Sequence, residues 1–228
     1  MLTPVETEAV LLSLRVAVWC VVATLPLGIG VAWLLARREF YGKNLLNGAL
    51  HMPLVLPPVA VGYVLLLTLG RNGPVGGWLY DTFGVSVAFT WEGAVVASAV
   101  MAFPLMVRAI RLSLETVDRR LEAAARTLGS GPVRIFVTVT LPLIAPGILT
   151  GAILAFALSL GEFGATITFV SNIAGETRTL PLALFTLAQT PGGESGALRL
   201  AAISAGLAMM ALLVSEATAG RLRRQLGG

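Results

Sequence analysis

Glu162 is the ionisable side chain whose position suggests chemistry most directly. It lies in the segment SLGEFGA at the end of a long apolar run, a position that can fall within a bilayer. A charged side chain at that depth costs about 2.5–3.5 kcal/mol, so such a residue is a functional candidate. Flanked by Gly161 and Gly164, the carboxylate could accept backbone N–H bonds and stabilise a break between helices. The alternative is a glutamate at the membrane surface in contact with water.

The residue patterns of common hydrolytic and metal sites are missing from this sequence. It has no G-x-x-x-x-G-K-[ST] loop, so the chain cannot cradle ATP phosphates itself. It also lacks H-E-x-x-H and G-x-S-x-G, and its single histidine, His51, has no evident serine and aspartate partners. We therefore interpret His51 as a packing or helix-end residue, and we predict no catalytic residue and no metal site.

A second chemical feature is the charged segment from Asp118 to Leu128, which the spacing predicts to be a short amphipathic helix. Asp118 is a favourable N-cap, and Gly129 follows where a left-handed residue ends many helices. Glu122 precedes Arg126 by four residues, which predicts an ion pair between them. Apolar residues share one face at the i, i+3, i+4, i+7 spacing: Leu121, Ala124, Ala125 and Leu128. Another protein could bind a small surface helix between two membrane spans and move it.

The composition around these residues is that of a membrane protein. Hydrophobic residues make up 56% of the chain and charged residues 12%, about half of the roughly 25% found in soluble proteins. The mean hydropathy is +0.86. The net charge of +4 comes from basic residues between apolar runs, which argues against nucleic-acid binding. The single Cys20 is expected to be a buried small hydrophobe, and the acidic start MLTPVETE predicts no cleavable signal peptide.

Five apolar runs are long enough to span a bilayer, which takes about 20 residues per helix. Pro142 and Pro146 predict a bend in the fourth run, and prolines also interrupt the start of the second. The segment from Thr179 to Gln189 is apolar but too short to span, so we expect it at the membrane edge, although a sixth span is possible. The five runs cover residues 16–36, 45–69, 93–110, 135–161 and 197–220.

The basic residues predict the orientation of these spans. Alternate connecting segments are rich in arginine, and the positive-inside rule places such segments in the cytoplasm. An odd number of spans then puts the N-terminus outside, and it puts the C-terminus and the helix around Glu122 inside. The three basic segments contain Arg37, Arg38 and Lys43; then Arg108, Arg111, Arg119, Arg120, Arg126 and Arg134; and finally Arg221, Arg223 and Arg224.

The segment EAAARTLGSGPVRIFVTVTLP, from Glu122 to Pro142, resembles the EAA loop of ABC importer permeases. That motif is Glu-Ala-Ala, three residues, Gly, nine residues, Ile, one residue, Leu-Pro. Counted from Gly129, the end of the motif fits at Leu141 and Pro142, with Val139 for Ile, while the motif Glu falls on Ala123, one residue after Glu122. Four further segments are similar to the molybdate permease branch: HMPLVLPPVAVGY, FPLMVRAIRLSLE, SLGEFGATITFVSN and TPGGESGALRL.

The resemblance implies an all-α integral membrane protein of the type I ABC importer permease kind, with about five spans. It implies one transmembrane domain over residues 1–228, in which residues 115–134 form the cytoplasmic coupling loop. It also implies a bacterial inner membrane, a homodimer, two ATP-binding subunits that hold ATP and Mg²⁺, and an external molybdate-binding protein. The ATPase coupling residues would be Glu122, Ala123, Ala124, Ala125, Arg126, Gly129, Leu141 and Pro142.

The offset of Glu122 favours a local role for this residue, because one position turns a helical side chain by about 100°. A pair with Arg126 is worth only about 0.2–0.5 kcal/mol, so Glu122→Ala is expected to be mild.

The translocation pathway should offer N–H and hydroxyl donors to an oxyanion. The donor candidates are Ser159, Thr166, Thr168, Ser171 and Asn172. Gly161, Glu162 and Gly164 are further pathway candidates, with Glu162 in a structural role. Tungstate and sulfate remain alternatives to molybdate, because these tetrahedral dianions are similar in size and the contacts that separate them are expected in another polypeptide. A stand-alone channel or secondary transporter is the less favoured class, and it would need no ATPase partner. An intramembrane enzyme is improbable, since no set of nucleophile and base is evident.

Overall fold

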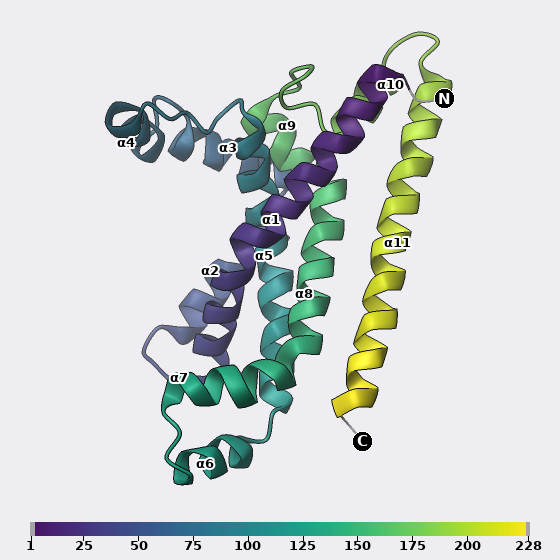
Figure 1. The fold of residues 1–228 in the computed structure, drawn as a ribbon. Helices are drawn as coiled ribbons and strands as arrows, with labels where there is room; N and C mark the ends of the chain where they lie inside the picture. The colour runs from purple at the N-terminus through teal and green to yellow at the C-terminus, as the bar shows by residue number, and fades with distance from the viewer. Residues whose placement is uncertain (1–2, 227–228) are drawn as a thin grey trace.

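The computed structural model describes residues 3–226, with side chains described up to residue 214 and at residue 217. Throughout that range the regular structure is helical, as predicted. Four long helices run between the two ends of the molecule (Figure 1): α1 (Pro4–Arg37), α5 (Trp91–Thr116), α8 (Leu141–Gly161) and α11 (Glu194–Leu226). Shorter elements lie between them: α2 (Lys43–Val55), α3 (Pro58–Leu69), α4 (Pro74–Phe83), α6 (Arg119–Thr127), α7 (Pro132–Ile135), η1 (Phe136–Thr140), α9 (Gly164–Val170) and α10 (Leu180–Ala188).

The second predicted span differs from the others. Four helical stretches are long and apolar enough to cross a membrane, and they correspond to the first, third, fourth and fifth predicted runs. The expected span over residues 45–69 is instead the pair α2 and α3, with a bend of 114° between them. Pro57 and Pro58 explain the break, because proline lacks an N–H and disfavours helical geometry in the residue before it. By length and composition, the described residues therefore contain four helices able to span a membrane, or five if the bent pair counts as one.

The core is formed where α5 packs between α1 and α8. Its fully buried side chains include Leu35, Met106 and Ile110. On α8, a Cβ at Gly147 would overlap Ser113 of α5, and a Cβ at Gly151 would lie 3.0 Å from the Met106 carbonyl oxygen. The two glycines thus let α8 approach α5 closely, a common use of small residues four positions apart in membrane helices.

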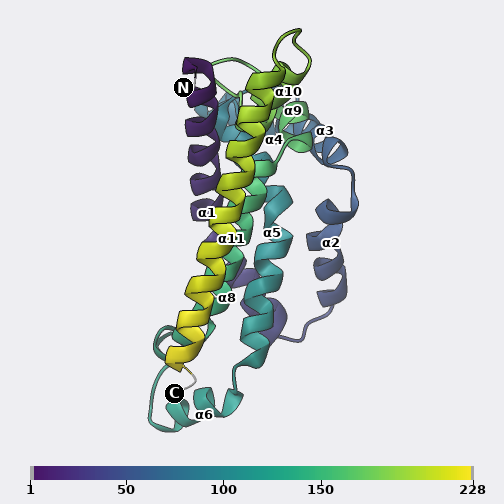
Figure 2. The same cartoon turned by 90° about the vertical axis from the view of Figure 1, so that its right-hand side faces the viewer.

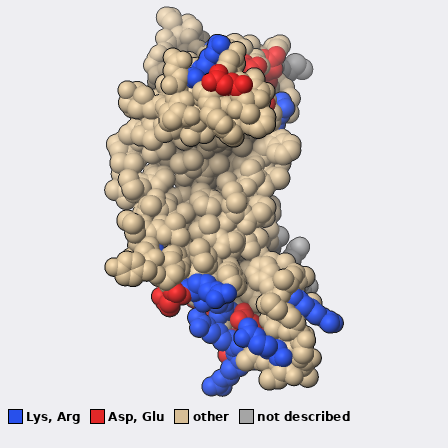
Figure 3. Space-filling model, turned by 90° about the vertical axis from the view of Figure 1, so that its left-hand side faces the viewer, with Lys and Arg blue, Asp and Glu red and all other residues tan. Residues whose placement is uncertain are grey.

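Charged side chains gather at the two ends of the molecule. On the face shown in Figure 3, a broad band without Lys, Arg, Asp or Glu separates the two charged ends. The chain starts at one end, and both α6 and the end of α11 lie at the other (Figures 1 and 2). We call the end with α6 the arginine-rich end. The predicted tail residues Arg221, Arg223 and Arg224 lie outside the described side chains.

The fourth span begins as a helix that lies across the arginine-rich end. In Figure 1, α7 is seen from the side below the long helices, and the chain then turns upward into α8. The turn between them, η1, is a π-helix that ends directly before Leu141 and Pro142. Because Pro142 cannot donate to the preceding turn, the helix changes its hydrogen-bond pattern here, and the predicted bend is confirmed.

The opposite end is built from short helices. α9 packs tightly on α3, since a Cβ at Gly62 would overlap the Ala165 carbonyl oxygen. α10 is nine residues long and occupies the segment that was expected at the membrane edge. Its first residue, Leu180, donates its backbone N–H to the buried Ser13 hydroxyl at 2.6 Å, which ties α10 to α1. The short helices at this end are therefore held in place by contacts with α1 and with one another.

Candidate coupling and translocation sites

The predicted helix after the third span is present as α6. The Asp118 carboxylate caps it by accepting from the Arg120 backbone N–H at 2.9 Å. Gly129 has φ +81°, the left-handed value predicted for the residue that ends this helix. The Ser130 N–H then reaches back to the Ala125 carbonyl at 3.2 Å, as in a Schellman ending. Both ends of α6 are thus fixed by local hydrogen bonds.

Glu122 does not form the predicted ion pair with Arg126. Its Oε1 accepts from Arg37 Nη2 of α1 at 2.9 Å and from the Thr140 hydroxyl of η1 at 2.9 Å. Only 9% of the Arg37 side chain and 18% of the Glu122 side chain are exposed. The prediction of a purely local role was therefore wrong in its geometry: Glu122 joins α6 to α1 and to η1.

The rest of α6 faces outward. Leu128 is 85% exposed and Leu121 is 48% exposed, while Ala123, Ala124 and Arg126 are exposed as well. Ala125 is half-buried against the protein. Leu141 is half-buried and Pro142 is exposed where η1 meets α8. Most of the predicted coupling residues therefore lie on the outward-facing α6, which Glu122 bonds to the rest of the protein. Leu141 and Pro142 lie apart from it, at the bend before α8.

Glu162 lies at the predicted break between two helices. α8 ends at Gly161 and α9 begins at Gly164, and the Glu162 Oε1 accepts from the Ala165 backbone N–H at 2.8 Å. This is the backbone role expected from the sequence. A carboxylate near the start of α9 satisfies a donor that has no partner within the helix.

The other predicted pathway residues occupy different surroundings. Ser159 and Thr166 are buried within the protomer. Asn172 donates to the Thr186 hydroxyl at 2.7 Å and accepts from Arg178 Nε at 2.8 Å, so both its amide nitrogen and its amide oxygen are hydrogen-bonded within the protomer. Gly161 is exposed and Gly164 is half-buried against Pro58. Their placement along an oxyanion pathway stays a prediction.

Two features were missed by reasoning from the sequence. Arg37 and Thr140 hold Glu122, although Arg37 is 85 residues away and was counted only as a topology signal. The structure also has two cavities that share Arg108: one of about 750 Å³ between α5 and α8, and one of about 310 Å³ between α2 and α5. Within residues 3–226, no group of three or more His, Cys, Asp or Glu side chains is arranged to hold a metal ion.

Comparison with known proteins gives consistent results. The family model described as "Binding-protein-dependent transport system inner membrane component" matches residues 25–220. The chain is 63% identical over 227 residues to the molybdenum transport system permease protein ModB of Escherichia coli strain K12, covering 100% of this chain and 99% of that protein. It is 58% identical over 222 residues to ModB of Haemophilus influenzae, covering 97% of each chain.

A solved structure supports the fold. A bacterial ABC transporter involved in the import of the acidic polysaccharide alginate superposes with a TM-score of 0.76 at 14% identity, covering 96% of this chain and 80% of that one. The all-helical spans, the outward-facing α6 and these matches agree, and the chain belongs to the family of inner-membrane components of binding-protein-dependent transport systems.

Proposed function

We propose that this chain is the membrane-spanning permease of an ATP-driven importer that carries molybdate across the inner membrane. The full-length identity of 63% to a molybdenum transport permease supports molybdate over other oxyanions. The chain is a transport subunit and not an enzyme, as the names of its relatives state. ATP and Mg²⁺ would be bound by a separate subunit, and no cofactor would reside in this chain.

The observation that carries the mechanism is the attachment of α6. Its exposed residues Leu121 and Leu128 offer an apolar contact to an ATP-binding subunit, while Glu122 links the helix to α1 and η1. A push on α6 would therefore act on two spans at once. Closure of two ATP-binding subunits would move α6 and open the translocation pathway outward, where it receives the oxyanion. ATP hydrolysis would then return the pathway to its inward-facing state.

The proposed complex contains two copies of this chain. α2 has no buried residue within the protomer, and its Leu45 and Val55 are largely exposed. The exposed side chains of α3, such as Tyr63 and Leu67, continue this apolar surface. A second copy and the surrounding lipid would cover it. An external molybdate-binding protein would deliver substrate at the end opposite α6.

We further propose that the arginine-rich end faces the cytoplasm, which places the N-terminus outside and the C-terminus inside. Residues 1–228 would act as one transmembrane domain, with residues 115–134 as its coupling loop. The coupling residues would be the α6 set from Glu122 to Gly129 with Leu141 and Pro142. Glu162, with Gly161 and Gly164, would shape the pathway rather than bind the anion, because a carboxylate repels a dianion.

Reconstitution tests this function. The permease, its ATP-binding subunit and its binding protein would be placed in proteoliposomes, and uptake of radiolabelled molybdate would be followed with excess tungstate or sulfate as competitors. We expect uptake that requires ATP and all three proteins. Uptake without the ATP-binding subunit would instead indicate a channel or secondary transporter. Uptake of sulfate in preference to molybdate would overturn the substrate assignment.

A further inference from the structure

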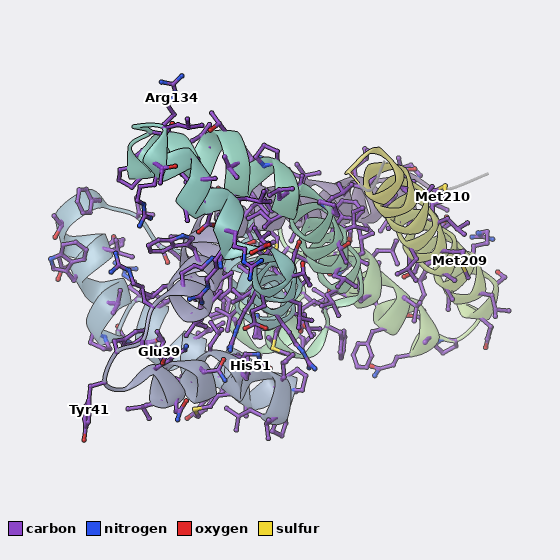
Figure 4. The ribbon with its side chains drawn as sticks, turned by 90° about the horizontal axis from the view of Figure 1, so that it is seen from below. Glu39, Tyr41, His51, Arg134, Met209 and Met210 are labelled. Carbon is purple, nitrogen blue, oxygen red and sulfur yellow. The ribbon has the colours of Figure 1, made fainter. Side chains whose placement is uncertain are left out.

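The smaller of the two cavities near Arg108 lies between α2 and α5, towards the arginine-rich end. It has a volume of about 310 Å³, and its polar walls are Asn47 and His51 of α2 with Arg108, Arg111 and Glu115 of α5. Figure 4, viewed from this end, shows His51 on one side of the molecule and Arg134 on the other, pointing away from the protein. No residue of α6 lines the cavity, so it is separate from the α6 surface.

The charges in this cavity do not cancel. Arg111 Nε donates to Glu115 Oε1 at 2.8 Å, so the only carboxylate of the cavity wall is already paired. Arg108 has neither a hydrogen bond nor an ion pair with any described residue. The guanidinium of Arg108 is therefore available to a ligand that enters the cavity.

The neighbouring polar groups are oriented to add donors. Asn47 Oδ1 accepts from Arg111 at 3.2 Å, which leaves the Asn47 amide nitrogen free to donate. His51 Nδ1 lies 2.8 Å from the Asn47 carbonyl oxygen and must donate to it, since a carbonyl only accepts. Nδ1 of His51 is thus occupied by a bond within α2. In this wall Arg108 has no partner among the described residues, and the Asn47 amide nitrogen is free. Arg111 keeps only Nη2 beyond its bonds to Glu115 and Asn47. Arg108 and Asn47 are therefore the main free donors.

We infer that Arg108 and Asn47 form a binding site for a tetrahedral oxyanion between α2 and α5. This inference rests on the proposed function, because the transported dianion is the oxyanion that would reach the site. A guanidinium suits such a ligand, since its N–H groups can contact two oxygens at once. With one charge and one amide the site would hold the anion loosely, as a transport step requires.

Arg108 also borders the larger cavity between α5 and α8. That cavity, of about 750 Å³, contains the hydroxyl residues Ser113, Thr116 and Thr150 along a mostly apolar wall. The same guanidinium can therefore contact an anion from either side of α5. This position suits a residue that receives an anion from one space and releases it into the next.

Equilibrium dialysis of the intact permease–ATPase complex tests the site. The complex would be held in nanodiscs of phosphatidylcholine alone, without the binding protein, and probed with radiolabelled molybdate and sulfate. We expect saturable binding that weakens about tenfold or more in Arg108→Gln, as loss of a charge-assisted hydrogen bond implies. Arg108→Lys should retain part of the affinity. Arg134→Gln, the same charge change on exposed α7, should bind like the original chain.

Several outcomes would overturn the inference. Arg108→Gln could bind the anions as tightly as the original complex while its unfolding midpoint and ATPase association are unchanged. The original complex could also bind no anion in phosphatidylcholine, yet retain an anionic phospholipid that Arg108→Gln loses. That result would identify a lipid phosphate site instead.

Failure of the proposed function gives a different result. Uptake of molybdate would then be absent in the full reconstituted system, although the Arg108-dependent binding of a dianion would persist.

Discussion

The two ends of this molecule each carry a glutamate, Glu122 within α6 and Glu162 at the break between α8 and α9, and the two carboxylates have different partners. At the arginine-rich end, Glu122 contacts Arg37 and Thr140, side chains from two other elements. At the opposite end, Glu162 accepts from the backbone of Ala165, three residues away. The first bond joins separate spans, whereas the second fixes the path of one chain segment. Force applied at α6 should therefore spread through the protein, while Glu162 should matter mainly for local shape.

The largest expected effect is a difference in labelling from outside the cell between the two ends of the molecule. In a Cys20→Ala background, Ser130→Cys should react with a membrane-impermeant maleimide only after the cells are broken. Ala174→Cys, in the exposed loop before α10 at the opposite end, should react in intact cells. Labelling is compared between intact and broken cells for each variant. Labelling of Ser130→Cys but not of Ala174→Cys in intact cells would show that the proposed topology is wrong.

Glu122→Ala is expected to reduce molybdate uptake strongly, contrary to the mild effect inferred from the offset in the motif. It would leave Arg37 nearly buried without its carboxylate, and breaking a buried pair costs up to about 3–5 kcal/mol. We expect a value near the lower limit, because both side chains keep some contact with water. Uptake should fall about tenfold or more at normal expression.

Glu39→Ala is the matched control for Glu122→Ala. Glu39 lies at the same end and pairs with Lys43 at 2.7 Å, but its side chain is 90% exposed. The hydrogen bond from Lys43 holds the pKa of Glu39 below its ordinary value, so the control also removes an ionised carboxylate. If Glu122→Ala took up molybdate as well as Glu39→Ala and the original chain, the bonds from α6 to α1 and η1 would not be needed for transport.

Gly129→Val should have an intermediate effect. The φ of +81° costs a residue with a side chain about 1–2 kcal/mol, although no neighbouring atom lies within 4 Å of a Cβ there. The end of α6 should move, and transport-coupled ATPase activity should drop several fold while membrane insertion is kept. Gly129→Asn should be milder, because asparagine tolerates this conformation. Unchanged coupling in the valine variant would contradict a fixed α6 ending.

Substitutions at Glu162 should have the smallest effect. Glu162→Ala loses one bond to a helix N-terminus, worth about 1 kcal/mol, and should lower the unfolding midpoint by about 2–4 °C. Glu162→Gln keeps an oxygen that can accept from Ala165 and should resemble the original chain. If the glutamine variant were as impaired in transport as the alanine variant, the charge itself would be required, and the backbone role would be insufficient.

Local features of the fold were predictable from the sequence because they depend on neighbouring residues. The spans follow from apolar length, the ends of α6 from Asp118 and Gly129, and the bend before α8 from Pro142. The prolines at 57 and 58 indicated an interruption, but the 114° angle depends on how α3 packs against α9. Sequence alone gives no such packing.

The sites were predictable only in part, for the same reason. The Glu162 bond spans three residues and was anticipated, whereas the partner of Glu122 is 85 residues away. Arg126 was predicted as the partner because the i, i+4 rule describes contacts within one helix only. Burial of Ser159 and Thr166 likewise depends on which neighbouring helices cover them. The position of Arg108 at a cavity between α2 and α5 likewise depends on how these two helices pack.

The length of α1 has a consequence for the lipid around the protein. Its 34 residues make a rod about 50 Å long, while the hydrocarbon layer of a bilayer is about 30 Å thick. Across a bilayer α1 would therefore have to tilt or project beyond the hydrocarbon, and we expect Arg37 in its last turn near the headgroups. A thicker bilayer would favour a more upright α1 and shift Arg37 relative to Glu122. Bilayer thickness would thus tune the coupling, and uptake measured across phosphatidylcholines of increasing chain length would reveal that dependence.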